Sequence, residues 1–173
     1  MIKLLKAGFF RLKKDVIFWL FVFLTIGIAG FTLFRYTSNE GVYLDKIVNE
    51  FIMYIGLFIA IFVSIFVGKE HSQGIIRNKI IVGHSRISIF LSNLIISIVV
   101  SLLCEAIFLL VVFLIGIPLF GQMQMTSTQF AMVLLNTILI IISFCSIYNF
   151  ISMICSEITI STTICIILFI AMF

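Results

Sequence analysis

Apolar residues fill most of the chain in long runs, and short polar segments separate these runs. A helix needs about 20 apolar residues to cross a bilayer, and four of the runs reach or approach that length. The predicted spans cover residues 16–34, 51–68, 87–119 and 130–154, and a shorter apolar run covers 161–173. The pattern therefore predicts an all-α fold: a polytopic transmembrane helix bundle of about five spans, forming one domain over residues 1–173.

The first 15 residues carry apolar and basic residues at helical spacing instead of an apolar run. The apolar stripe comprises Ile2, Leu5, Phe9, Leu12 and Val16, and the remaining surface carries Lys3, Lys6, Arg11, Lys13 and Lys14. A basic amphipathic helix beside a span is expected to lie in the membrane interface, with its cations towards anionic headgroups. We therefore predict an interfacial helix over residues 1–15 that contacts membrane lipid. The alternative is a basic flank without a fixed helix.

Charge is scarce and unevenly distributed. Charged residues make up 10% of the chain and hydrophobic residues 63%, so the charges are too few to coat a water-facing surface. All 11 Lys and Arg lie at or before Arg86, with most of them in residues 1–14 and 69–86. Because Lys and Arg accumulate on the cytoplasmic side, we predict a multi-pass protein of the cell membrane with a cytoplasmic N-terminus. The basic residues flank apolar runs, so they indicate membrane orientation and not a nucleic-acid partner.

The segment 69–86 is the longest polar stretch and contains a short amphipathic pattern. Its isoleucines are Ile75, Ile76, Ile80 and Ile81, and the other side carries Arg77, Asn78 and Lys79. Gly74 and Gly83 bracket the pattern, as glycine often does at helix ends. We predict a short helix that docks onto a cytoplasmic partner or the membrane surface. The alternative is a solvated basic loop that only fixes the topology.

Two stripes at four-residue spacing run along the second and third spans. The first consists of the small residues Gly56, Ala60, Ser64 and Gly68. Small residues let helices approach closely, so this stripe predicts a packing or dimerisation face, unless the register is chance. The second stripe consists of Asn93, Ser97, Ser101 and Glu105. A carboxylate inside a bilayer normally faces a bundle interior or water. The second stripe therefore predicts either a substrate pathway or a hydrogen-bonded packing seam.

The sequence contains no motif of an enzyme or metal site. It lacks G-x-x-x-x-G-K-[ST], H-E-x-x-H and G-x-S-x-G, so neither ATP binding nor a hydrolytic centre is predicted for this chain. The four cysteines form no C-x-x-C pair, and the two histidines are distant from them in sequence. We therefore predict no catalytic residues, no metal ligands and no cofactor bound by this chain.

The stretch 68–86, placed between two spans and after an amphipathic N-terminal helix, resembles ABC-2-type (type-2 ABC exporter) permease subunits. Glu70, Gly74 and Arg86 match the acidic residue, the glycine and the basic residue of that family's first cytoplasmic loop. The resemblance implies a non-enzymatic permease subunit of an ATP-driven exporter. Its partners would be a separate ATPase subunit, which holds ATP and Mg, and a second permease subunit in a homo- or heterodimer.

The resemblance also implies which residues couple the ATPase to the spans. They would be Glu70, Gly74, Ile75, Ile76, Arg77, Asn78, Lys79, Ile80, Gly83 and Arg86. The cargo would be a peptide, a lipid or a drug-like molecule. Permeases of this family usually have six spans, and the fifth apolar run here ends at Phe173 without a polar flank. We therefore expect the natural protein to continue beyond that residue.

Two other functions compete with the exporter. A non-transporting membrane adaptor or immunity-type protein, which sequesters a membrane-active peptide, would also suit a short chain with few charges in its spans. A membrane-embedded enzyme acting on lipid would have only Glu105 and the hydroxyl groups of the spans for its chemistry.

Overall fold

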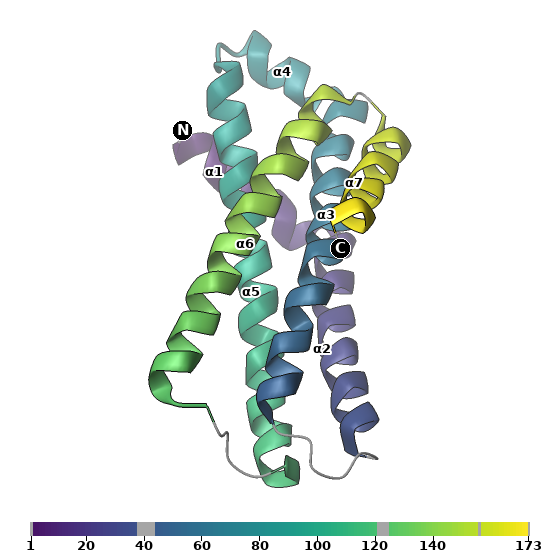
Figure 1. The fold of residues 1–173 in the computed structure, drawn as a ribbon. Helices are drawn as coiled ribbons and strands as arrows, with labels where there is room; N and C mark the ends of the chain where they lie inside the picture. Colours follow the sequence, from purple (N-terminus) through teal and green to yellow (C-terminus); the bar gives the residue numbers. More distant parts are fainter. Residues whose placement is uncertain (1, 38–43, 121–124, 156, 173) are drawn as a thin grey trace.

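The computed structural model describes residues 2–37, 44–120, 125–155 and 157–172. Within these ranges the chain is helical and has no strand (Figure 1). The helices are α1 (Ile2–Lys14), α2 (Val16–Thr37), α3 (Leu44–Ser72), α4 (Ile75–Ile81), α5 (Arg86–Phe120), α6 (Ser127–Ile154) and α7 (Ile158–Met172). Four of them, α2, α3, α5 and α6, contain apolar stretches long enough to cross a membrane. The predicted all-α fold is therefore confirmed, and four of its described helices are long and apolar enough to cross a membrane.

The last apolar run forms a shorter helix. α7 has 15 residues, which is below the length of about 20 that a perpendicular span needs. It lies beside α3 near the α4 end of the bundle (Figure 1). The structure thus provides four helices of spanning length where the sequence predicted about five spans.

The connection predicted over residues 35–50 is shorter than expected, because α3 already begins at Leu44. Leu44, Ile47 and Val48 recur at helical spacing and are buried, which extends the helix beyond its apolar run. The end of α2 is tied to this extension, since Tyr36 and Arg35 both donate hydrogen bonds to Glu50 Oε1. The predicted turn at 120–129 is likewise shorter, because α6 begins at Ser127.

The bundle has an apolar exterior as well as an apolar core. Phe23, Phe31 and Phe34 point outward from α2 and are mostly exposed. Polar residues of the same helix face inward: Thr25 and Thr32 are buried, and their hydroxyls donate to backbone carbonyls of their own helix. Such a surface suits a hydrocarbon environment, because apolar side chains are stable there, whereas polar groups need hydrogen-bond partners within the protein.

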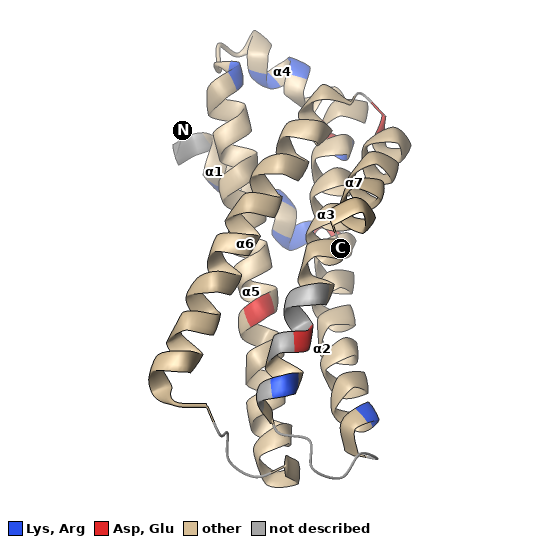
Figure 2. Cartoon of the chain, viewed as in Figure 1, with Lys and Arg blue, Asp and Glu red and all other residues tan. Residues whose placement is uncertain are grey.

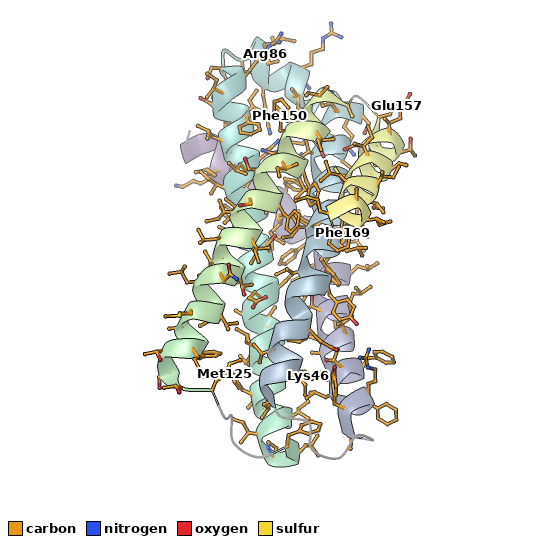
Figure 3. All side chains as sticks on the ribbon, in the orientation of Figure 1. Lys46, Arg86, Met125, Phe150, Glu157 and Phe169 are labelled. Atoms are coloured by element: carbon orange, nitrogen blue, oxygen red, sulfur yellow. The ribbon has the colours of Figure 1, made fainter. Side chains whose placement is uncertain are left out.

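The two ends of the bundle differ in charge. Figure 2 shows basic residues gathered on α1 and α4, and a smaller charged group at the far ends of α2 and α3. Figure 3 places Arg86 and Glu157 at the α4 end, with Lys46 and Met125 at the opposite end. α1 lies across the bundle instead of along it (Figure 1), and its Gly8 lies against the Ile96 side chain of α5.

Candidate functional site

The chain reverses direction at α4, and a glycine on each side makes the reversal possible. Gly74 has φ 65° and Gly83 has φ 93°, values in the left-handed region that residues with a Cβ rarely adopt. The seven-residue helix between them starts with a hydrogen bond from the Asn78 N–H to the Gly74 carbonyl at 3.0 Å. The structure therefore has a helix where the isoleucine pattern and the two glycines predict one.

A buried carboxylate at the end of α3 holds this helix in place. Glu70 is 1% exposed, and its Oε1 accepts hydrogen bonds from Arg11 Nη1 at 2.8 Å and Lys79 Nζ at 2.7 Å. Its Oε2 accepts a hydrogen bond from Asn93 Nδ2 at 2.8 Å. These donors belong to α1, α4 and α5, so one carboxylate joins four helices. We call Glu70 and these three donors the Glu70 cluster.

Further contacts fix α1 against the end of α3. Arg11 Nη2 donates to the Phe66 carbonyl at 3.2 Å, and the Arg11 guanidinium lies 4.5 Å from the centre of the Phe66 ring. Lys69 Nζ lies 3.1 Å from Asp15 Oδ1, and the same oxygen accepts the Ile17 N–H at the start of α2. These contacts hold the corner between α1 and α2 against the end of α3, just before the turn that leads into α4.

The sequence pointed to Glu70, Lys79 and Asn93, but it did not predict that Lys79 and Asn93 both bond to Glu70. It also did not predict that Arg11 bonds to Glu70 or that Lys69 pairs with Asp15. Asn93 was assigned to the stripe of the third span. A usable signal was present: a glutamate next to an apolar span must find cationic or amide partners when it is buried. Which cations it finds depends on how α1 folds back on α3.

The apolar side of α4 is divided between the chain's own interior and the surface. Ile76 is 9% exposed and packs inward, whereas Ile80 is 39% and Ile81 72% exposed. Val82, which the sequence analysis did not single out, is 77% exposed. Arg77 and Asn78 are exposed as well. The exposed apolar surface at α4 is therefore formed by Ile80, Ile81 and Val82, and we call it the α4 outer face.

Two hollows flank α4. One of about 270 Å³ is lined by His71, Gly74, Ile76, Arg77, Ile80 and Ile81. The other, of about 260 Å³, is lined by His71, Ile76, Ile80, Arg86, Ile89 and Met153. His71 stands between α4 and α6, with its Nε2 3.2 Å from the Met153 carbonyl. Gly74 and Arg86, which the sequence linked to coupling, thus line hollows beside the same short helix.

The stripe of small residues on α3 is covered by helices of this chain. Gly56, Ala60, Ser64 and Gly68 are all buried. A Cβ at Gly56 would lie 2.6 Å from the ring of Phe169, and one at Gly68 would lie 2.9 Å from the Ile158 side chain. Both neighbours belong to α7. Close approach of α7 to α3 therefore depends on these two glycines.

The polar stripe of α5 lies inside the bundle. Ser97 and Ser101 donate to backbone carbonyls one turn earlier, and the Ser101 hydroxyl lies 3.6 Å from Cys145 Sγ of α6. Glu105 is buried, and its Oε2 has no hydrogen-bond partner among the described residues. A hollow beside Ser101 and Cys104 measures about 10 Å³, which is room for about one water molecule.

In the described part of the chain, no three His, Cys, Asp or Glu side chains gather closely enough to hold a metal ion. Asn93 is the member of the polar stripe that the structure brings to the Glu70 cluster, while Glu105 lies three turns further along α5.

No family model, curated protein or solved structure matches this chain.

Proposed function

We propose that this chain is the permease subunit of an ATP-driven exporter, and that a separate ATPase subunit binds it at α4. The observation that carries the proposal is the α4 outer face, which is apolar, exposed and mounted on the Glu70 cluster. A short helix that only fixed the topology would need neither the exposed isoleucine and valine side chains nor a buried carboxylate at its base.

The surroundings of α4 suggest what its partner looks like. Exposed Ile81 and Val82 would enter an apolar cleft, and Arg77 beside them would meet carboxylates at the rim of that cleft. The two hollows beside α4 leave space for partner side chains. Displacement of α4 by the partner would move Lys79 and Glu70, and it would reach α5 through Asn93 and α1 through Arg11, because both donate to the Glu70 carboxylate.

In the proposed permease, the helix bundle spans the membrane. The N-terminus and α4 face the cytoplasm, α1 lies in the interface, and α7 takes part in a fifth span. A second permease subunit, identical or related, completes the transport pathway. The stripe containing Ser97, Ser101 and Glu105 lies along this pathway. The cargo is a peptide, a lipid or a drug-like molecule.

Co-purification from the native membrane in mild detergent tests the proposal. An ATPase subunit identified by mass spectrometry is expected at about one per permease chain. A double Ile80→Asp and Ile81→Asp variant should lose it, because two carboxylates on the α4 outer face cannot enter an apolar cleft without a large desolvation cost. Ile76 is a poor target, since it packs inside this chain.

Ser85→Asp is the control, because it adds a carboxylate at an exposed position close to α4 but outside its outer face, and the carboxylate can still accept the Ser88 N–H. Retention of the ATPase by this variant, together with its loss from the double variant, supports the proposal. Recovery of the chain without any ATPase contradicts it. Protection against a membrane-active peptide in cells that lack an ATPase partner would then favour the adaptor function.

A further inference from the structure

A further hollow, with basic walls, lies where the end of α3 meets the corner between α1 and α2. It measures about 250 Å³ and is lined by Arg11, Lys14, Asp15, Lys69 and Gln73. Arg11, Lys14 and Asp15 come from the end of α1 and the corner that follows it, and the others come from the end of α3 and the turn after it. The Glu70 cluster and the Lys69–Asp15 ion pair hold these two segments together.

The charges around this hollow do not cancel. Its two nearest carboxylates are engaged: Asp15 with Lys69 and Glu70 with both Arg11 and Lys79. Lys14 has no carboxylate partner among the described residues, and its Nζ lies 4.6 Å over the ring of Phe10. Arg11, Lys69 and Lys79 therefore share the two carboxylates, and the unpaired Lys14 adds to the excess of positive charge at the hollow.

An apolar surface begins directly beside the hollow. Phe10 and Val16 are exposed on the two helices that meet at Asp15, and exposed Leu20 continues this surface along α2. Trp19 is also exposed, and its Nε1 donates to the Lys13 carbonyl at 3.2 Å. A tryptophan with one bonded polar atom and an exposed ring is typical of the level of the lipid headgroups.

We propose that this hollow binds the phosphate group of one anionic phospholipid, whose acyl chains lie along the exposed face of α2. Lys14 and Arg11 would bind the phosphate oxygens, and the Gln73 amide would donate to the rest of the headgroup. Asp15 would repel a second negative charge, so a phosphodiester with one charge fits better than a free phosphate dianion. The proposal requires membrane insertion but does not depend on an ATPase partner.

Lys13 and Lys14 provide a matched pair for the test. They are adjacent, exposed and equally charged, but only Lys14 lines the hollow. The full chain is reconstituted in bilayers of phosphatidylcholine with a minor share of phosphatidylglycerol, and native mass spectrometry counts the lipids that remain bound. The wild type should retain phosphatidylglycerol. Lys14→Gln should reduce the retained amount about tenfold, because it removes a charge-assisted hydrogen bond to the phosphate, which contributes about 1.5 kcal/mol or more.

Lys13→Gln should retain phosphatidylglycerol as the wild type does. Equal losses in both variants would overturn the proposal in favour of diffuse attraction to the membrane, and no loss in either would also overturn it. A second arm adds inorganic phosphate to the detergent-solubilised chain. If phosphate displaces the retained lipid and Lys14→Gln abolishes this displacement, the hollow is a site for free phosphate and the lipid assignment is wrong. Unchanged thermal unfolding of both variants verifies that they are folded.

Discussion

Glu70 is buried, and its hydrogen bonds explain why a carboxylate is tolerated at this position. A buried ion costs several kcal/mol unless charges and hydrogen bonds compensate it. Here Arg11 and Lys79 provide two cationic donors and Asn93 a neutral one. The arrangement is asymmetric, because loss of the carboxylate would leave two partly buried cations without their partner.

Glu70→Gln is therefore expected to lower the free energy of unfolding by about 3 kcal/mol, in the range for breaking buried ion pairs. The amide keeps one oxygen acceptor but removes the charge that holds Arg11 and Lys79. Thermal unfolding in detergent measures the effect. Glu157→Gln is the control, because Glu157 is exposed and should tolerate the change. A similar loss of stability in both variants would show that the Glu70 cluster contributes little.

At the residue scale, the sequence indicated which residues are important for the structure, but it indicated less well which of them contact each other. The position of Glu70 after an apolar run was readable. Its pairing with Arg11, 59 residues away, was not, because it depends on how α1 crosses α3 and α5. Asn93 shows the same limit. Helical periodicity placed it in a stripe with Glu105, whereas in the folded bundle its side chain donates a hydrogen bond to Glu70.

Among the helices, α3 is the most enclosed, and its glycines determine how near α7 can lie. A Cβ on Gly68 would lie 3.2 Å from the Ile158 Cα, a backbone atom that cannot rotate away. At Gly56 the obstacle is the Phe169 ring, a side chain. Gly68 is thus the stricter requirement for packing of the two helices.

Gly68→Ala is expected to destabilise the bundle by about 1–3 kcal/mol, as added methyl groups do in well-packed cores. Gly30→Ala is the comparison, since a Cβ there meets nothing within 4 Å. Alanine is the better helix former, so that variant should be neutral or stabilised by up to about 1 kcal/mol. Thermal unfolding of both variants in the same detergent measures their stability relative to the wild type. Equal behaviour of the two would contradict close α3–α7 packing.

Local patterns predicted the elements well where glycine or apolar spacing sets their limits. Gly74 and Gly83 bracket α4 because the reversal needs positive φ, and glycine signals that locally. The early start of α3 was missed because polar residues interrupt the apolar spacing of Leu44, Ile47 and Val48. The division of the α4 isoleucines was also unreadable, because it depends on what lies beneath Ile76.

The whole molecule has one end with α1, α4 and the start of α7, and an opposite end with the starts of α3 and α6. Positive charge is concentrated at the first end, as counts of Lys and Arg along the sequence already suggested (Figure 2). The charge distribution predicts that the first end faces the cytoplasm. The packing of the helices fixes which segments share a side, whereas the orientation itself stays a prediction.

Cysteine labelling tests the orientation. Cys104, Cys145 and Cys165 are buried, so replacement of the partly exposed Cys155 by serine leaves little background. In that chain, Gln73→Cys should react with a membrane-impermeant maleimide only from the cytoplasmic side, and Thr128→Cys only from outside. The reverse result would contradict the orientation. Labelling of both positions from one side would contradict the arrangement of α5 as a span.

The contact between Gly8 and Ile96 divides α5 into two unequal lengths. At 1.5 Å per residue the length from Ile96 to Arg86 is about 15 Å and the length from Ile96 to Phe120 about 36 Å, so a pivot at this contact would make α5 a lever with unequal arms. If α5 turns as a rigid rod, a small displacement at the α4 end becomes roughly twice as large at the opposite end. A push on the Arg86 end of α5 would therefore produce its largest displacement at the Phe120 end.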